Sequence, residues 1–193
     1  MTKKEARCSF IEKRKHLSKI ECEILSETIA KIFFKYFNLK NFQSIHIFLP
    51  IEQKAEINTW PIINNIRKCF PNVDIVIPKI DISNNILTSI HFTPELKLVN
   101  NNWGILEPEE HGSTYLEHLI DIVLIPLLAF DTNGNRVGYG KGFYDKFFLK
   151  CKKTVVKVGL SFFDPVENIE DISDLDIPLN YCITPNKVHT FKI

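Results

Sequence analysis

The segment from Asp131 to Asp145 carries residue types that bind and transfer phosphate. Glycines stand at three alternate positions: Gly138, Gly140 and Gly142. Glycine lets the backbone approach a bulky ligand closely and adopt positive φ. Arg136 and Lys141 add two positive charges, and the carboxylate of Asp145 could bind Mg²⁺ beside a phosphate. Backbone donors, cations and a metal-binding acid are what phosphoryl transfer requires, so this segment is a candidate phosphate site.

The segment matches neither of the common phosphate-binding motifs. Asn135 stands five residues before Gly140 and Gly142 replaces the required Ser or Thr, which excludes a Walker A loop. The alternation of the glycines excludes a GxGxxG loop. From spacing alone, a glycine-rich turn packed between a strand and a helix explains the segment as well as a phosphate site does.

Short apolar runs alternate with helical patterns along the chain. Helices are predicted over 3–17, over 18–36 after a capping box at Ser18, over 59–69 and over 142–150. Strands are predicted over 44–50, 73–78, 120–130, 155–160 and 181–184, with a hairpin around 86–92. This order predicts a single α/β domain over residues 1–193 with a largely parallel sheet. Ligands bind beyond the carboxyl ends of such strands, where the glycine segment falls, and the free N–H groups of a helix starting at Gly142 would favour an anion there.

Composition excludes several classes of protein. The chain has 193 residues, of which 45% are hydrophobic and 24% charged, as in ordinary globular domains. The longest apolar run, Ile122–Phe130, is half of what a membrane span needs, and the polar, cationic start lacks the apolar core of a secretory signal. The five cysteines show no C-x-x-C pair, which favours reduced thiols in a cytoplasmic protein.

Charge is distributed unevenly although the net charge is only +1. Residues 1–40 contain ten Lys or Arg and five Asp or Glu, whereas residues 161–180 contain six acids and no base. A sequence pI near 7.6 is below that expected of a nucleic-acid-binding domain, so we expect a local ligand site and neither a nucleic-acid nor a membrane partner.

Several motifs together resemble the 5-formyltetrahydrofolate cyclo-ligase family, also called the methenyltetrahydrofolate synthetases. The longest similarity runs through 125–131 and 134–145. Shorter ones are Lys3–Arg7, Phe48–Pro50 with Glu56–Thr59, Trp103–Pro108 and Asp176–Asn180. The resemblance therefore extends over nearly the whole chain, with the order and spacing of the motifs kept.

The resemblance implies a fold and a reaction. The fold would be a three-layer α/β/α arrangement with a Rossmann-like sheet, similar to the NagB, RpiA and CoA-transferase-like proteins. The reaction would convert ATP and 5-formyltetrahydrofolate to ADP, phosphate and 5,10-methenyltetrahydrofolate, with Mg²⁺ as the metal. It would proceed by phosphorylation of the formyl oxygen and attack by N10, and the enzyme would be a cytoplasmic monomer.

The resemblance also assigns roles to particular residues. Arg136 and Lys141 would be catalytic, and Asp145 and Asp176 would bind Mg²⁺. The folate would contact Leu49, Glu56, Trp103 and Tyr144. ATP would contact Lys3, Lys4, Arg7, Arg136, Gly138, Gly140, Lys141, Gly142, Phe143 and Tyr144.

Other interpretations of these residues stay open at this stage. Lys3 and Arg7 could form a solvated helix face, Asp176 could be one surface acid among several, and Trp103 could be a core indole instead of a stacking ring. Two alternative functions remain. One is an isomerase of sugar phosphates on a related scaffold, and the other is a nucleotide- or RNA-binding module that uses the basic first helix. His111 and His118 lack a third ligand at a supportive spacing, so no zinc site is predicted.

Overall fold

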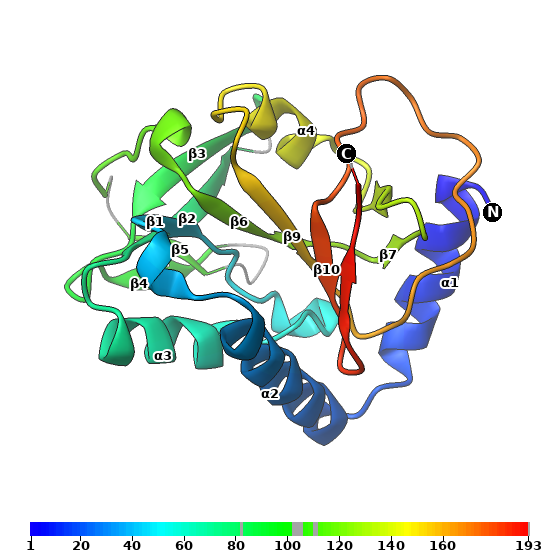
Figure 1. The fold of residues 1–193 in the computed structure, drawn as a ribbon, viewed down its shortest axis with the longest axis horizontal. Coiled ribbons are helices and arrows are strands. Elements are labelled where there is room, and N and C mark those ends of the chain that lie inside the picture. Colours follow the sequence, from blue (N-terminus) through cyan, green and yellow to red (C-terminus); the bar gives the residue numbers. More distant parts are fainter. Residues whose placement is uncertain (82, 102–105, 110–111, 193) are drawn as a thin grey trace.

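The computed structural model describes residues 1–81, 83–101, 106–109 and 112–192, which have an α/β arrangement of helices and strands (Figure 1). The helices are α1 (Lys3–Lys15), α2 (Lys19–Tyr36), α3 (Trp60–Cys69) and α4 (Phe143–Phe148), with 3₁₀ turns at Leu39–Asn41, Glu52–Lys54 and Glu117–Leu119. The central strands are β1 (Ser44–His46), β2 (Asp74–Asp81), β3 (Ile86–His91), β6 (Ile122–Pro126), β9 (Val156–Leu160), β10 (Tyr181–Ile183) and β11 (Val188–Thr190). Two small ribbons consist of β4 (Leu98–Asn100) with β5 (Leu106–Pro108), and β7 (Ala129–Phe130) with β8 (Arg136–Val137).

The seven central strands form one mixed sheet in the order β11-β10-β9-β6-β1-β2-β3. The four inner pairings are parallel, while β11 and β3 pair antiparallel at the two edges. The prediction of a largely parallel α/β sheet is therefore confirmed, and β2 with β3 forms the predicted hairpin. The small strands β4, β5, β8 and β11 were not predicted.

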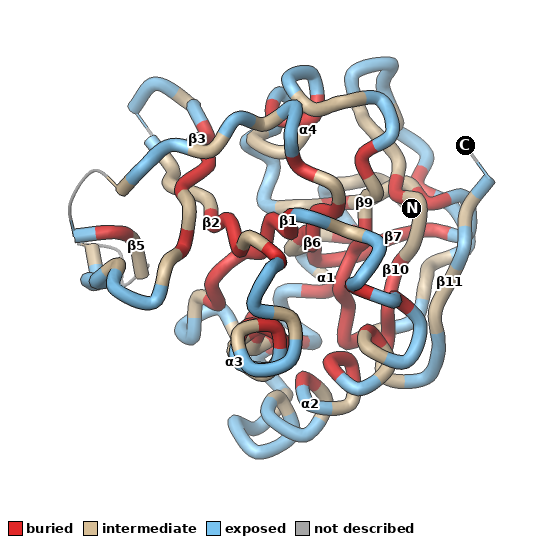
Figure 2. The backbone as a smooth tube through the Cα atoms, turned by 60° about the vertical axis from the view of Figure 1, so that its left-hand side comes forward, coloured by how far each residue is buried: buried red, intermediate tan, exposed pale blue. Residues whose placement is uncertain are grey.

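Both faces of the sheet are covered, as expected for a mostly parallel sheet. Alternate residues of β6 point to opposite sides: Ile122 and Leu124 join the core beneath α2 and α3, whereas Val123 and Ile125 join a second core. That second core includes Phe147 and Phe148 of α4. Figure 2 shows the resulting band of buried backbone through the centre of the molecule.

The predicted strand over 120–130 is wrong as a single element. β6 ends at Pro126, and the chain turns through Leu127 and Leu128 so that β7 can pair with β8 instead. Proline has no N–H to extend the ladder, which is consistent with the strand ending there. The consequence is a separate hairpin that carries Arg136.

Two other predicted elements are shorter than expected. The ladder of β1 ends at His46, although the N–H of Ile47 still donates to the carbonyl of Val76 at 2.8 Å. Gly142 is the N-cap of α4, with φ of +68°, and the helix ends at Phe148. With six residues, α4 provides only a small helix dipole towards the glycine segment.

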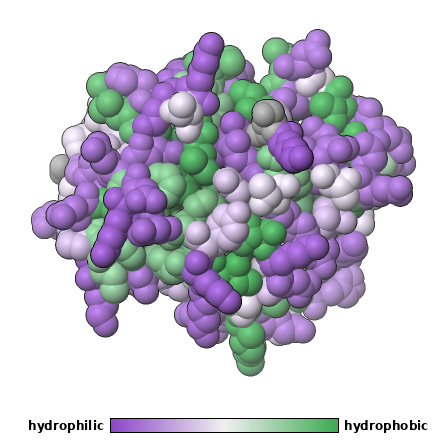
Figure 3. All heavy atoms as spheres, in the orientation of Figure 1, coloured by the Kyte–Doolittle hydropathy of each residue, from purple (hydrophilic) through white to green (hydrophobic). Residues whose placement is uncertain are grey.

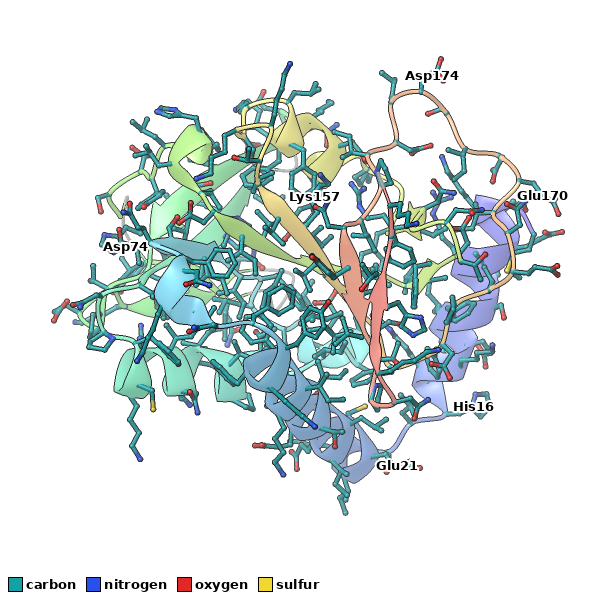
Figure 4. All side chains as sticks on the ribbon, viewed as in Figure 1. His16, Glu21, Asp74, Lys157, Glu170 and Asp174 are labelled. Atoms are coloured by element: carbon teal, nitrogen blue, oxygen red, sulfur yellow. The ribbon has the colours of Figure 1, made fainter. Side chains whose placement is uncertain are left out.

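The basic start and the acidic segment of the chain lie against each other. Thr2 caps α1 with a capping box, and the backbone N–H of Lys3 donates to Asp171 at 2.6 Å. Figure 4 shows Glu170 on the segment that runs beside α1. The two charge clusters found in the sequence thus partly neutralise each other.

The visible surface is mixed in character. The face seen in Figure 3 is largely hydrophilic, with hydrophobic side chains in small groups between polar ones. In the described part of the chain, no helix has both the length and the apolarity needed to cross a bilayer.

Candidate active site

A cavity of about 480 Å³ lies where the glycine segment, α1 and the carboxyl ends of the parallel strands meet. Phe48 and Leu49 line it after β1, and Pro126 lines it at the end of β6. Its wall includes thirteen of the predicted site residues: Lys3, Arg7, Leu49, Glu56, Arg136, Gly138, Gly140, Lys141, Gly142, Phe143, Tyr144, Asp145 and Asp176. Residues up to 173 positions apart in sequence thus share one cavity at the edge of the sheet where α/β proteins bind ligands.

Buried Asp131 fixes the loop that precedes the glycines. Its carboxylate accepts hydrogen bonds from the backbone N–H groups of Asn133 and Asn135, both at 2.9 Å, and of Ile169 at 3.1 Å. The amide of Asn135 donates a further bond at 2.8 Å. These bonds hold the turn between β7 and β8 and so set the direction in which the glycine segment leaves β8.

The glycines of this segment differ in backbone conformation and in the space around them. Gly140 has φ of +90°, and a Cβ there would lie 3.2 Å from the guanidinium carbon of Arg7. At Gly138 a Cβ would meet no heavy atom within 4 Å, and its carbonyl accepts a 3.0 Å bond from Nε of Arg7. Gly138 therefore leaves open space beside the cavity wall, as expected where a ligand lies against the backbone.

One face of α1 supplies cations to the cavity. Lys3 and Arg7 are four residues apart, so both point to the same side of the helix, and both line the cavity. Lys4 lies about 100° further around the helix. Its side chain is exposed and lies outside the cavity lining, so the structure does not bring it to the other predicted ATP contacts.

The two predicted metal-binding acids are each paired with a cation. Arg136 donates to Asp145 at 2.6 Å, and Lys3 donates to Asp176 at 2.5 Å. Burial lowers the pKa of Arg136 despite Asp145 beside it. Burial raises the pKa of Asp176, but the hydrogen bonds from Lys3 and Ser173 and the charge of Lys3 together outweigh it and lower that pKa.

Asp145 and Asp176 could bind a metal ion that is also coordinated by a ligand. Among the described residues, no group of three or more His, Cys, Asp or Glu side chains is placed to bind a metal on its own. Mg²⁺ usually takes one or two carboxylates together with phosphate oxygens and water. Asp145 and Asp176 fit that donor set in a cavity that also presents cations for phosphate. His111, considered above for zinc, lies outside the described residues.

Glu56 is a buried acid that also lines the cavity. Its carboxylate accepts a 3.0 Å bond from the N–H of Ile51 and a 2.8 Å bond from the hydroxyl of Tyr139. Burial raises its pKa, although both hydrogen bonds oppose that effect. Each carboxylate oxygen keeps a second acceptor position, so Glu56 can still accept hydrogen bonds from a ligand.

Two buried donors in the wall have no partner in the described part of the chain. They are the hydroxyl of Tyr144 and the Nη1 of Arg136. Burial raises the pKa of Tyr144, so its hydroxyl keeps its proton. Unsatisfied buried polar groups are costly, and their presence in a cavity wall is typical of a site completed by a ligand. Lys141 is exposed at the rim, and Trp103 lies outside the described residues.

Sequence reasoning missed ten of the residues that line this wall, among them Tyr139 and Lys54. Tyr139 lies between two glycines that were assigned to ATP, and Lys54 places its ammonium 4.4 Å from the centre of the Tyr139 ring. An aromatic residue between ligand-facing glycines was the available signal for Tyr139. Lys54 lies in the 3₁₀ turn Glu52–Lys54, which has no periodicity by which sequence could orient its side chains.

Comparisons with known proteins show which family the chain resembles. A model of the 5-formyltetrahydrofolate cyclo-ligase family matches residues 1–185. The 5-formyltetrahydrofolate cyclo-ligase of Haemophilus influenzae is 30% identical over 141 residues, covering 71% of this chain and 74% of the relative. The Escherichia coli protein of the same name is 25% identical over 179 residues, covering 92% and 97%.

Solved structures show the same fold. The Aquifex aeolicus 5,10-methenyltetrahydrofolate synthetase, solved by NMR, superposes with a TM-score of 0.82 at 28% identity, covering 100% of this chain and 94% of that one. A synthetase of the same name from Mycoplasma pneumoniae has a TM-score of 0.74 at 24% identity, covering 95% and 98%.

Proposed function

The chain belongs to the 5-formyltetrahydrofolate cyclo-ligase family, and we propose how its cavity carries out the ATP-dependent closure of 5-formyltetrahydrofolate to 5,10-methenyltetrahydrofolate. The observation that carries the proposal is that cations and a buried acid line one cavity. Lys3, Arg7 and Arg136 lie with the glycine segment, as a polyphosphate requires, and Glu56 lies where a flat ring with N–H donors could bind.

The chemistry needs a phosphoryl group because the formyl oxygen is a poor leaving group. The formyl oxygen attacks the γ-phosphorus, and the bond to the bridging oxygen of ADP breaks. The resulting N5-formyl phosphate has iminium character, and the lone pair of N10 attacks its carbon. N10 loses its proton, and phosphate departs with the former formyl oxygen as the 5,10-methenyl group forms. No side chain acts as a nucleophile, so the protein contributes position and charge.

We assign the phosphates to the cations and the glycine segment. Arg136 and Lys141 would stabilise the charge of the transferring phosphoryl group, with Lys3 and Arg7 on the remaining phosphates. Gly138, Gly140, Gly142, Phe143 and Tyr144 would form the wall along ATP, and Lys4 would contribute only long-range charge. Mg²⁺ bound with ATP by Asp145 and Asp176 would neutralise phosphate charge.

We assign the folate to the side of the cavity that contains Glu56. A carboxylate with one free acceptor position on each oxygen suits two neighbouring N–H donors of a pterin ring. Leu49 and Tyr144 would pack against that ring, and Trp103 would stack on it. We also propose that the sheet, with its two covered faces, resembles that of NagB-like proteins. The enzyme is further proposed to act as a monomer.

Isotope transfer tests the proposed path. 5-Formyltetrahydrofolate labelled with ¹⁸O in the formyl group should give one ¹⁸O atom in the inorganic phosphate, measured by mass spectrometry. Phosphate without the label would contradict phosphorylation of the formyl oxygen. Unlabelled folate in ¹⁸O-water is the control, and its phosphate should carry no label.

A further inference from the structure

Three charged or polar side chains form a chain of hydrogen bonds beside the cavity. Arg14 of α1 donates from Nη1 to the hydroxyl of Tyr139 at 3.2 Å, and that hydroxyl donates to Glu56 at 2.8 Å. Arg14 and Glu56 are buried, at 5% and 7% exposed, whereas Tyr139 between them is 38% exposed. The Nη2 of Arg14 also donates to the carbonyl of Leu127, which fixes the guanidinium. None of these bonds is needed to complete a helix or strand.

We infer that Tyr139 and Arg14 are positioning residues that orient the carboxylate of Glu56 toward the folate ring. The inference rests on the proposed function, because Glu56 is there assigned to folate. With Ile51 and Tyr139 donating to one lone pair each, the two remaining acceptor positions of Glu56 have a fixed direction. Arg14 keeps the Tyr139 hydroxyl in the orientation that donates to Glu56.

The hydrogen bonds to Glu56 and the positive charges near it favour its ionised form. Burial raises the pKa of Glu56, while the bonds from Ile51 and Tyr139 and the charges of Arg14 and Lys54 lower it. Burial and the charge of Glu56 raise the pKa of Tyr139, so that hydroxyl stays a donor. Tyr144 also feels the charge of Glu56, and burial keeps it neutral. Losing the Tyr139 hydroxyl removes a donor to the carboxylate and raises the pKa of Glu56.

The variant Tyr139→Phe tests the inference because it removes only the hydroxyl. The aromatic ring, and with it the contact with Lys54, stays in place. We expect the KM for 5-formyltetrahydrofolate to rise about tenfold and the KM for ATP to change less than about twofold. The acidic limb of kcat/KM for folate should move about one pH unit upward, because Glu56 is protonated at a higher pH.

A second tyrosine provides a matched control, because it also donates a hydrogen bond to a carboxylate but does not line the cavity. The hydroxyl of Tyr115 donates to Asp74 at 3.2 Å, and Asp74 begins β2 on the opposite side of the molecule from α1 (Figure 4). Tyr115→Phe should leave both KM values and the pH profile unchanged. The melting temperature of each variant checks that the fold is intact.

The outcomes separate this inference from the proposed function. Equal rises in both KM values, or an unchanged folate KM with an unshifted acidic limb, would overturn the roles of Tyr139 and Arg14 while leaving the proposed function intact. Wild-type protein without activity on 5-formyltetrahydrofolate would overturn both.

Discussion

At the scale of single residues, the cavity pairs two of its cations, Arg136 and Lys3, with acids. The side chain of Arg136 is only 7% exposed, and that of Lys3 is 16% exposed. A buried guanidinium without a partner would be costly, so Asp145 and Asp176 help to hold these cations in place. Lys141 differs, because it is exposed at the rim and has no partner in the described part of the chain.

Replacing Lys141 by Ala should reduce activity without affecting the fold. We expect kcat/KM to fall by roughly 10²–10³, the scale for loss of a positioned charge at a transferring phosphoryl group. The free energy of unfolding should change by less than about 0.5 kcal/mol, because an exposed side chain loses little packing. Steady-state kinetics and urea unfolding measure the two effects. Unchanged kinetics, or a protein that unfolds, would give Lys141 a structural role instead.

Replacing each proposed metal ligand by Asn should separate metal binding from ion pairing. Asp145→Asn should raise the Mg²⁺ concentration needed for half-maximal activity strongly, and Asp176→Asn should raise it more weakly. Asp145→Asn should also lower the free energy of unfolding by about 3 kcal/mol, because Arg136 loses its charged partner while buried. Asp176 pairs with the more accessible Lys3, so its loss should cost about 1 kcal/mol.

The measurement is a Mg²⁺ titration at saturating ATP and folate, with urea unfolding of each variant in parallel. If neither variant changes the Mg²⁺ dependence, ATP and water hold the metal and the two carboxylates act only as partners of the cations.

At the scale of elements, the β7–β8 hairpin and the glycine segment form one unit that faces α1. Gly138 and Gly140 are two residues apart yet differ in conformation and in surroundings. Gly140→Ala should destabilise the protein by about 1 kcal/mol or more, because φ is positive and the new Cβ approaches Arg7. Gly138→Ala should leave stability nearly unchanged, because its Cβ would meet open space.

The same pair of variants tests whether ATP lies against the loop. If it does, Gly138→Ala should raise the KM for ATP by about tenfold although the fold is intact, since a methyl group would occupy part of the ligand's space. Melting temperatures and ATP titrations measure this. An unchanged KM for ATP in Gly138→Ala would place the nucleotide elsewhere in the cavity.

Elements with strong local patterns were predictable from the sequence, and those set by pairing were not. The capping box at Ser18 begins α2 as predicted, and the short apolar runs indicated the parallel strands. The break after Pro126 was missed because Leu127 and Leu128 are as apolar as the strand itself. Strands such as Val188–Thr190 have only three residues and exist through their partner, which no local pattern specifies.

The site was predictable only to the extent that its residues lie in motifs. Most of the residues that the family resemblance indicated do line one cavity. The contact between Tyr139 and Glu56 joins positions 83 apart, and Arg14 joins them from a third element. Such long-range bonds depend on the packing of α1 against the hairpin, which the sequence does not encode locally.

At the scale of the whole molecule, the sheet buries a histidine at its centre. His46 in β1 is fully buried, lies 4.8 Å from Phe147 between ring centres, and neither ring nitrogen has a hydrogen-bond partner in the described residues. Burial lowers its pKa from 6.5 to about 3. The folded protein therefore keeps His46 neutral under conditions in which the unfolded chain protonates it.

Stability should fall in acid for this reason. Between the unfolded pKa of 6.5 and the folded pKa of about 3, the unfolded state binds the extra proton, so stability decreases as pH falls. Between pH 7 and pH 5 this contribution is about 2 kcal/mol. His46→Leu should lose less stability than the wild type over that interval, as measured by urea unfolding at both pH values. An equal loss in the two proteins would show that His46 is not the group responsible.

The central claim is that one cavity joins MgATP to 5-formyltetrahydrofolate. The most direct measurement follows the near-ultraviolet absorbance of methenyltetrahydrofolate, where the substrate does not absorb, with purified protein and 5-formyltetrahydrofolate. The account predicts product only when ATP and Mg²⁺ are both present, with one ADP released for each folate closed. Product formed at the same rate without nucleotide, or ATP hydrolysis without any absorbance change, would contradict it.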